Sequence, residues 1–529
     1  MISADLHDGW TLTAVGGQIP DRISASPVPA QVPGSVHTDL LSAGLIRDPY
    51  VGLTEAELVW MHRADWRYER NLTRPVLADG ERADLVFEGL DTVATITLGD
   101  TVLGHTYNQH RTFRFDIRDE LAAGDAGGTT LAVGFRSALE YAESEAARIG
   151  ARPAAYDHPL NMVRKMACSF GWDWGPDLQT AGIWRPVRLQ RWSVARLASV
   201  RPLVSIDETG AARVTVHVDV ERSGLELAEG ALTVHARLSP AADVTATRAA
   251  IDAVVTIAPG SCSGMIDVVV TEPALWWPRG YGDQPLYDLD IELRSAGSRP
   301  ERASAADPLD GWHRRIGLRT VDLDTRDDDI GTAFVIRVND TPIFVKGANW
   351  IPDDHLLTRI TRDRIANRIT QAVDANINLL RVWGGGIYES EDFYELCDEA
   401  GVMVWQDFLL ACAAYPEEEP QLGEFEAEAR EHIARLSAHP SLVLWNGGNE
   451  NLWGYMDWGW QELLAGRTWG HRYYTEIFPQ ALAELDPTRP YAQGSPYSPG
   501  AALNDTDPND PDHGTHHQWE VWNRIDYTA

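Results

Sequence analysis

The chain has 529 residues, 44% of them hydrophobic and 23% charged, which is enough for about three domains of roughly 150 residues each. Asp and Glu outnumber Lys and Arg by 78 to 45, giving a formal net charge of −33. Such a charge repels phosphate backbones and anionic lipid headgroups, so nucleic acids and membranes are poor candidates for partners. No run of about 20 apolar residues is present, and the N-terminal MISADLHDGW lacks the basic start and apolar stretch of a signal peptide. We therefore expect a cytoplasmic protein.

The cysteines give no sign of a disulfide framework or a metal site. They are widely spaced, with no CxxC pair and no histidine cluster at zinc-ligand spacing around them. The sequence therefore predicts reduced thiols of a structural type. The four are Cys168, Cys262, Cys397 and Cys412.

Two β-sandwiches are predicted before the last third of the chain. Residues 1–195 contain short apolar runs broken by Gly, Asp and Asn, with period-two alternation in ADLVFEGLDTVATITLG (83–99), which indicates an antiparallel sandwich. Alternation continues over 196–322, for example at Tyr287, Leu289, Ile291 and Leu293. About seven such strands in this length predict a small immunoglobulin-like sandwich.

From residue 323 to 529 the pattern changes to strands followed by helices, which is typical of a (β/α) barrel with a parallel sheet. Thr361 and Ser390 precede predicted helices, Gly401 follows the second of them, and a third helix is expected near 424–437. The predicted strands are IFVKGANW (343–350), expected to be buried, NLLRVW (378–383), VMVWQDF (402–408), SLVLWN (441–446) and YAQGSP (491–496).

Polar side chains close these predicted strands, and in a (β/α) barrel they converge on one mouth. They are Asn349, Trp350, Arg381, Trp383, Asp407 and the group from Asn446 to Glu450. Glu450 follows two glycines, and we expect Trp445, Trp453 and Trp458 to wall it. Partial desolvation would then raise the pKa of Glu450 toward that of a useful general acid. A solvated loop glutamate fits the pattern equally well.

WNGGNEN (445–451) resembles the acid/base segment of glycoside hydrolase family 2, and further stretches resemble its β-mannosidase branch. These are SFGWDWGP (169–176), LWWPRGYGDQPLY (275–287), VKGANWIPDD (345–354), NLLRVWGGGIYE (378–389) and MVWQDF (403–408). The resemblance implies a jelly-roll sugar-binding-type sandwich, an immunoglobulin-like sandwich and a (β/α)8 TIM barrel. It also implies exo-acting, retaining hydrolysis of terminal non-reducing β-D-mannose residues in β-mannoside oligosaccharides, with no metal or other cofactor.

The resemblance also implies roles for individual residues. Glu450 matches the general acid/base, and Asn449 matches the neighbour that bonds the sugar 2-hydroxyl. Trp383 and Trp458 match aromatic walls of the site, although ordinary packing is the alternative for each. Asp173 matches a residue that reaches the sugar from the first domain, and His517 a rim histidine. Asp407 is expected either to contact sugar or to orient Arg381.

Retaining hydrolysis needs a second carboxyl about 5–5.5 Å from the acid, to attack the anomeric carbon. The resemblance places that nucleophile in an SEFG or SEYG motif on a late barrel strand, and neither motif occurs here. We therefore expect a chain whose barrel is incomplete at the C-terminus, which lacks the nucleophile and is inactive alone. Unpaired sheet edges and uncovered apolar faces should follow.

Three other functions stay open at this point. Another family 2 activity, such as an exo-β-glucosaminidase or a β-galactosidase, uses the same barrel chemistry and differs only in pocket contacts. A non-catalytic carbohydrate-binding protein is an alternative from a different class. A structural role is disfavoured by the many polar groups at strand ends.

Overall fold

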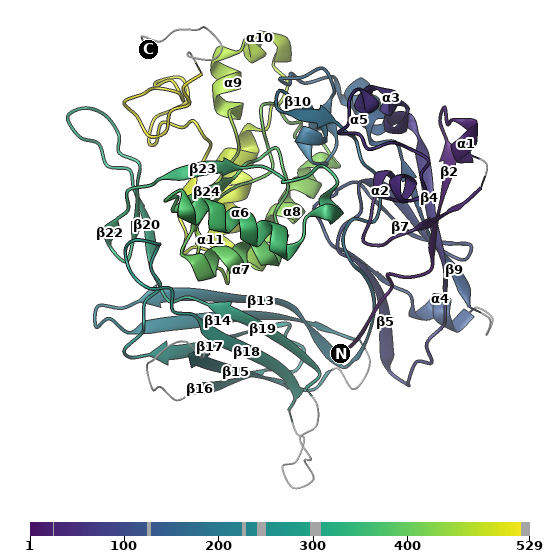
Figure 1. Cartoon of the computed structure of the whole chain (residues 1–529). Helices are drawn as coiled ribbons and strands as arrows, with labels where there is room; N and C mark the ends of the chain where they lie inside the picture. The colour runs from purple at the N-terminus through teal and green to yellow at the C-terminus, as the bar shows by residue number, and fades with distance from the viewer. Residues whose placement is uncertain (25, 124–127, 225–228, 241–249, 297–307, 520–529) are drawn as a thin grey trace.

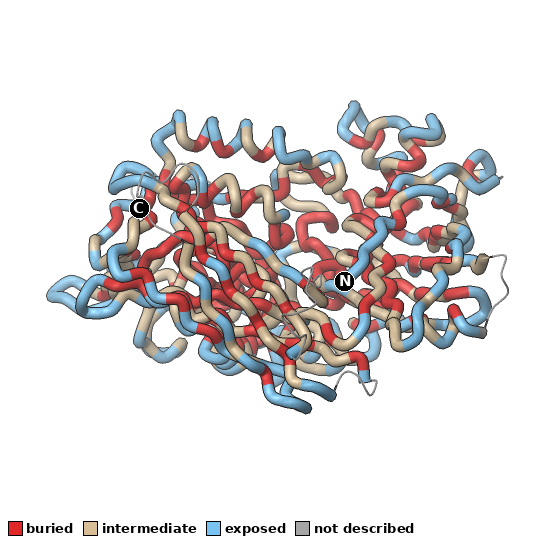
Figure 2. The backbone as a smooth tube through the Cα atoms, turned by 90° about the horizontal axis from the view of Figure 1, so that it is seen from below, coloured by how far each residue is buried: buried red, intermediate tan, exposed pale blue. Residues whose placement is uncertain are grey.

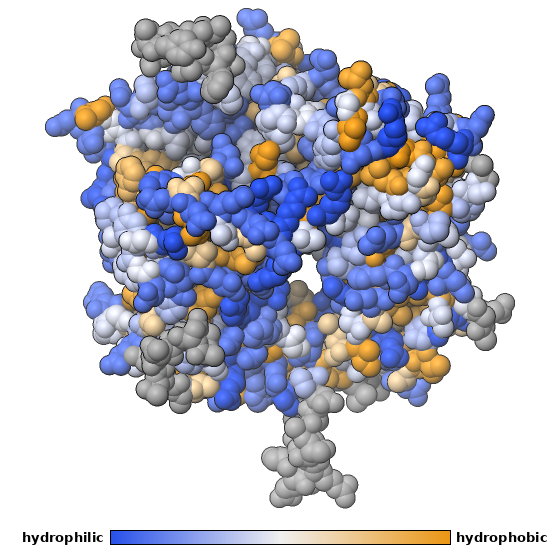
Figure 3. All heavy atoms as spheres, in the orientation of Figure 1, coloured by the Kyte–Doolittle hydropathy of each residue, from blue (hydrophilic) through white to orange (hydrophobic). Residues whose placement is uncertain are grey.

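The structure is a computed structural model and describes residues 1–24, 26–123, 128–224, 229–240, 250–296 and 308–519. It has three parts: a sandwich formed by the N-terminal third on the right, a parallel sheet with helices packed beside it, and a second sandwich below that sheet (Figure 1). The predicted three-part architecture is confirmed. Hydrophilic side chains cover most of the face seen in Figure 3, with hydrophobic ones in small groups.

The first sandwich pairs two antiparallel sheets, with strand orders β1-β12-β5-β8 and β3-β2-β4-β9-β6-β7. Its strands are β1 (Ile2–Asp5), β2 (Trp10–Gly16), β3 (Val28–Ala30), β4 (Asp65–Leu72), β5 (Glu81–Phe87), β6 (Val93–Leu98), β7 (Thr101–Thr106), β8 (Phe113–Asp116), β9 (Thr129–Arg136) and β12 (Val187–Ser193). The hairpin of β10 (Phe170–Trp172) and β11 (Gly175–Asp177) stands apart from both sheets. The helices are α1 (Asp21–Ser24), α2 (Val36–Ser42), α3 (Thr54–Glu57), α4 (Arg118–Ala123) and α5 (Ala138–Ile149).

The second sandwich packs a three-stranded sheet, β13-β14-β17, against a four-stranded sheet, β16-β15-β18-β19. Its strands are β13 (Ala195–Ile206), β14 (Ala212–Arg222), β15 (Leu232–Pro240), β16 (Ile251–Ile257), β17 (Ser263–Val270), β18 (Tyr287–Ser295) and β19 (Asp310–Ile316). Period-two alternation determines the inner faces, because Tyr287, Leu289, Ile291 and Leu293 are all buried. Figure 2, seen from below, shows buried and less buried positions alternating along these strands.

A small sheet of β20 (Val321–Asp324), β21 (Val335–Val338) and β22 (Thr341–Pro342) leads into a parallel sheet with the order β23-β24-β25-β26-β27. The parallel strands are β23 (Gly347–Trp350), β24 (Leu379–Val382), β25 (Met403–Asp407), β26 (Leu442–Asn446) and β27 (Tyr491–Ala492). The helices are α6 (Arg362–Asp374), α7 (Glu391–Ala400), α8 (Gln421–Leu436), α9 (Asn451–Asp457), α10 (Trp460–Leu464) and α11 (Phe478–Leu485). Strands β24 and β26 are buried throughout, as a parallel sheet covered by helices requires.

Two of the three predicted helix boundaries show the expected capping chemistry. The Thr361 hydroxyl accepts a hydrogen bond from the Arg364 amide at 3.3 Å at the start of α6, and Gly401 ends α7 in the left-handed conformation at φ 69°. Ser390 precedes α7 in extended backbone, without a side-chain cap.

One strand prediction is wrong. The expected buried strand over 343–350 is only β23, whose first three residues are exposed, and Phe344 before it is 76% exposed. β23 is the terminal strand of the sheet and, within the described chain, pairs with β24 alone. Side chains at such an edge have no neighbour on their outer side, so apolar composition does not bury them.

The first sandwich and the parallel sheet share one hydrophobic core. Val93, Leu139 and Phe170 from the first sandwich belong to the same buried cluster as Val382 and Phe425. A buried ion pair between Arg164 and Glu428, 2.7 Å apart, joins the same two parts. The second sandwich has a separate core, in which Ala438 is the contribution from the barrel part.

Candidate active site

Polar side chains from neighbouring parallel strands meet at the carboxyl edge of the sheet, as predicted. The in-register pairs place Asn349 of β23 beside Arg381 of β24, and Asp407 of β25 beside Asn446 of β26. Arg381 Nη2 lies 2.8 Å from Asp407 Oδ2, and Arg381 Nη1 lies 3.3 Å from Asn349 Oδ1. The sheet alone therefore brings a charged and amide-rich cluster to one point.

Asp407 has no exposed surface and accepts hydrogen bonds on both carboxyl oxygens. Oδ1 receives Arg381 Nε at 3.2 Å, Trp405 Nε1 at 3.0 Å and Asn446 Nδ2 at 2.7 Å, and Oδ2 receives Arg381 Nη2 at 2.8 Å and the Gly384 amide at 3.0 Å. A carboxylate so enclosed does not reach a sugar. Of the two roles expected for Asp407, the structure supports orienting Arg381, and direct substrate contact does not fit.

The loop after β26 presents Asn449 and Glu450. Gly447 permits the turn, because a Cβ there would lie 2.1 Å from the Gln493 carbonyl oxygen. Asn449 forms parallel bridges to Ala411 and to Ser495, so its backbone runs between the loops that follow β25 and β27. Glu450 has a φ of 62° and donates its amide to the Ser495 carbonyl at 2.8 Å. A non-glycine residue held in this conformation is a strained position that the surrounding loops must maintain.

The Glu450 side chain is 10% exposed and has a hydrogen-bond partner on each carboxyl oxygen. Oε1 lies 2.7 Å from His517 Nδ1 and accepts Trp519 Nε1 at 3.0 Å, and Oε2 lies 3.3 Å from Cys412 Sγ. The Ser495 hydroxyl lies 2.8 Å from the other ring nitrogen of His517. Glu450 is therefore fixed in position by three side chains from two separate loops.

The expected rise in the pKa of Glu450 is not found. Burial raises the pKa, but the hydrogen bond from His517, its charge when the ring is protonated, and the bonds from Trp519 and Cys412 outweigh burial and lower it. Burial also lowers the pKa of His517, so its ring is favoured in the neutral form. This arrangement stabilises Glu450 as a carboxylate.

The tryptophans are placed differently from one another. Trp445 does not wall the acid, because it lies in the core, stacks on Phe408 with ring centroids 5.1 Å apart and donates to Asp486. Trp453 and Trp458 contact each other at 5.5 Å, and Trp458 is partly exposed. A wall of three indoles around Glu450 was therefore a wrong expectation, and the role of Trp458 stays a prediction.

The first sandwich reaches the parallel sheet through the β10–β11 hairpin. Trp172 and Trp174 lie edge-on against Trp383, with ring centroids 4.9 and 5.6 Å away. Asp173, at the turn between them, has an exposed side chain, and its amide donates to the Tyr156 hydroxyl at 3.2 Å. The turn that carries Asp173 is thus brought beside Trp383, 210 residues further along the sequence.

The glycines of WGGG (383–386) allow close contacts. A Cβ on Gly384 would lie 2.5 Å from the Leu410 carbonyl oxygen, and one on Gly385 would lie 1.9 Å from the Trp383 ring. The Gly385 carbonyl also accepts the amide of Cys168, from the first sandwich, at 2.9 Å. These glycines therefore let Trp383 fold back over its own loop.

Sequence reasoning missed three residues of this site, namely Cys412, Ser495 and Trp519. The loop after a barrel strand was the available signal for Cys412, which lies five residues past Asp407. Trp519 lies two residues beyond the predicted His517, so the same segment carries both. Ser495 had no signal beyond its place after the fifth strand.

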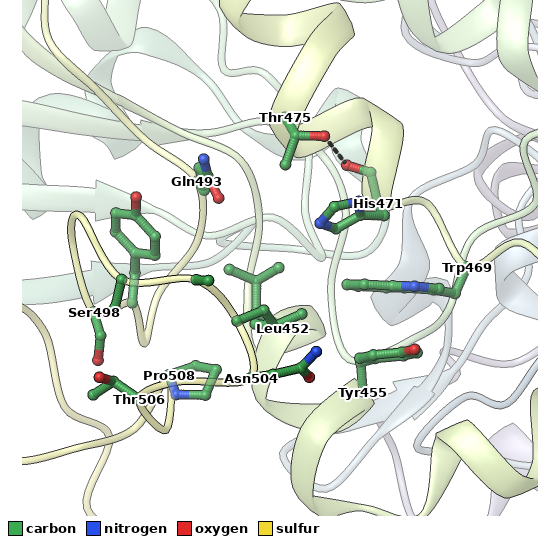
Figure 4. A pocket seen from close by; sticks show the side chains of 14 residues that line it. Leu452, Tyr455, Trp469, His471, Thr475, Gln493, Ser498, Asn504, Thr506 and Pro508 are labelled. Carbon is green, nitrogen blue, oxygen red and sulfur yellow. Dashed lines mark hydrogen bonds between the residues drawn. The ribbon is translucent and has the colours of Figure 1, made fainter.

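A separate pocket of about 470 Å³ is lined in part by residues of α9 (Figure 4). Leu452 and Tyr455 line it, and Tyr455 stacks face to face on Trp469 with centroids 4.1 Å apart. Glu450 and Asn449 do not line this pocket. It is therefore distinct from the cluster at the strand ends.

Neither a metal site nor a bilayer-spanning helix is found in the part of the chain that the structure describes. No group of three or more His, Cys, Asp or Glu side chains there is arranged to hold a metal ion. No described helix combines the length and apolar character needed to cross a bilayer.

Three consecutive segments match one family. Residues 10–185 match the glycosyl hydrolase 2 galactose-binding domain-like description, 195–319 match glycosyl hydrolases family 2, and 332–495 match the TIM barrel domain of that family. Together they cover both sandwiches and the parallel sheet in order. The chain therefore belongs to glycosyl hydrolase family 2.

Within this family the chain is similar to β-mannosidases. It is 34% identical over 540 residues to β-mannosidase B of Emericella nidulans, covering 98% of this chain and 59% of that protein. It is 32% identical over 521 residues to the β-mannosidase of Capra hircus, covering 94% and 56%. The chain thus spans less than two thirds of the length of these relatives.

Solved structures agree with this similarity. The β-D-mannosidase of Dictyoglomus thermophilum superposes with a TM-score of 0.86 at 36% identity, covering 99% of this chain and 60% of that one. The exo-chitosanase of Amycolatopsis orientalis superposes with a TM-score of 0.69 at 19% identity, covering 93% and 53%. At that identity the second likeness shows the fold alone.

Proposed function

We propose that this chain carries the acid/base half of a retaining, exo-acting β-mannosidase, which removes terminal non-reducing β-D-mannose residues. The observation that carries the proposal is the carboxyl of Glu450, buried at a strand end beside Asn449 and held by hydrogen bonds on both oxygens. Similarity to β-mannosidases over nearly the whole chain supports mannose as the sugar.

In the first step Glu450 gives its proton to the glycosidic oxygen while a second carboxylate attacks the anomeric carbon. The bond from that carbon to the leaving oxygen breaks, and a glycosyl-enzyme ester forms. In the second step Glu450 takes a proton from water, which displaces the enzyme carboxylate. The carboxylate form of Glu450 described above suits this second step.

We propose that the attacking carboxylate lies outside these 529 residues. Asp407 is the best-placed substitute, but Arg381 neutralises it and it is fully buried. A nearby attacking carboxylate would add like-charge repulsion, which raises the pKa of Glu450 and favours the protonated acid. The chain alone should therefore bind a β-mannoside without turning it over.

Azide tests this proposal, because an added anion can occupy the place of a missing nucleophile. With p-nitrophenyl β-mannoside and azide, we expect azide to attack the anomeric carbon, the bond to the aryl oxygen to break, and α-mannosyl azide to form with inversion. E450Q should bind the mannoside, yet form product from a poor leaving group about 10²–10⁴-fold more slowly, the usual contribution of general acid catalysis. E462Q, at an exposed position on α10, is the matched control.

Two outcomes would reject parts of the proposal. Comparable turnover without azide would place the nucleophile within this chain. A panel of aryl β-glycosides tests the choice of sugar. If the mannoside neither binds nor reacts, while a glucosaminide or a galactoside binds or reacts, the chain has a different family 2 activity.

A further inference from the structure

Cys412 lies in the loop after β25 and is fixed in place by its own backbone. Its φ is 47°, and its amide donates to the Asn449 carbonyl at 2.9 Å. Its carbonyl accepts the amide of Ala155, from the first sandwich, at 2.9 Å. The thiol is buried. Cys412 is thus held between the first sandwich and the loop that carries the acid.

The direction of each hydrogen bond around this thiol follows from Arg381. A guanidinium donates only, so the oxygen of the Asn449 amide must face Arg381 Nη2, 2.9 Å away. The Asn449 nitrogen then faces Cys412 Sγ at 3.2 Å and donates to it. The thiol's own hydrogen is left for Glu450 Oε2, at 3.3 Å.

The thiol keeps that hydrogen. Burial raises the pKa of Cys412 well above its ordinary value, and the nearby charge of Glu450 raises it further. A neutral thiol both donates and accepts weakly, whereas a thiolate beside the Glu450 carboxylate would repel it. Cys412 therefore acts as a directional link from Asn449 to Glu450.

We propose that Cys412 is a positioning residue that orients the general acid/base Glu450 and the sugar-binding Asn449 as one unit. This inference rests on the function proposed above. The thiol restrains Oε2 on the buried side. Oε1 is held on the other side by His517 and by the 38% exposed Trp519.

The Glu450 carboxyl stretching band in the infrared, assigned as the band lost in E450Q, reports this role without catalysis. Following the band against pH gives the midpoint of Glu450 protonation in the full chain. C412A removes a donor to the carboxylate, so the midpoint should rise by about one pH unit. C412S retains a donor and an acceptor and should stay within a few tenths of a unit of the wild type. The other groups that face this cluster are His517, Arg381 and Asp407.

C397A is the matched control, because Cys397 on α7 is a fully buried thiol remote from Glu450 in the fold. It should lower the melting temperature as C412A does, while leaving the Glu450 midpoint unchanged. An unchanged midpoint in C412A, or an equal shift in C397A, overturns the positioning role.

The azide assay then separates the two proposals. If product forms, C412A should lower its rate roughly tenfold and C412S much less. A shifted midpoint without any mannoside binding would retain the link between Cys412 and Glu450 and reject the proposed function. Normal product formation by C412A with an unshifted midpoint would retain the proposed function and reject the link between Cys412 and Glu450.

Discussion

Replacing Asp407 by Asn should be among the most destabilising single changes at the carboxyl edge of the parallel sheet. Oδ1 of Asp407 accepts three donors and Oδ2 accepts two. Whichever oxygen becomes an amide nitrogen then faces at least two donors that it cannot satisfy. The Arg381 side chain, 9% exposed, also loses its counter-charge. Breaking one side of a buried ion pair costs about 3–5 kcal/mol.

Urea unfolding followed by tryptophan fluorescence measures this loss. D392N is the control, because Asp392 pairs with Arg362 at 2.6 Å in the same part of the fold, but both side chains are about 40% exposed. Such a pair is worth about 0–1 kcal/mol. R381Q combined with D407N removes both charges and should recover part of the loss. A D407N effect no larger than that of D392N would refute the reasoning.

Two further predictions concern pH and packing. Burial lowers the pKa of His439, but Asp398 and Glu391 outweigh burial and raise the pKa to about 9. The stabilisation from protonated His439 is therefore complete below pH 6.5 and is lost as the pH rises through 9. The free energy of unfolding should fall by roughly 3 kcal/mol over that interval, and H439Q should flatten the fall. Parallel pH curves for the two proteins would contradict this. G385A should push the Trp383 ring away from Trp172, which changes the near-ultraviolet circular dichroism and weakens aryl mannoside binding at least tenfold in calorimetry. G311A is the control, because a Cβ there has only an ordinary contact at 3.7 Å, and it should leave both measurements unchanged. Equal binding by both variants would refute the assignment of Trp383.

Local patterns predicted most of the fold. Period-two alternation determined the inner faces of the second sandwich, and the caps at Thr361 and Gly401 marked helix ends correctly. The prediction that the apolar runs in β24 and β26 are buried was correct, because both strands have a neighbouring strand on each side. The exposure of residues 344–346 was not predicted, since this segment lies beside a sheet edge and its burial depends on what pairs with that edge.

The site was predictable only as far as strand ends determine it. Asn349, Arg381 and Asp407 converge because parallel strands end at one edge. The state of Glu450 was missed, because its pKa depends on donors that arrive from distant loops. Cys412 lies 38 residues before it and His517 lies 67 residues after it. Spacing along a chain does not reveal which hydrogen bonds such loops will form.

The core shared by the first sandwich and the barrel part limits how this chain can be rearranged in evolution. A recombination event that exchanged the N-terminal sandwich for that of a distant homologue would leave Val382 and Phe425 facing mismatched side chains and Glu428 without Arg164. These two parts should therefore be inherited together. The second sandwich has its own core, to which the barrel part contributes Ala438, so exchanging it should disturb fewer core contacts.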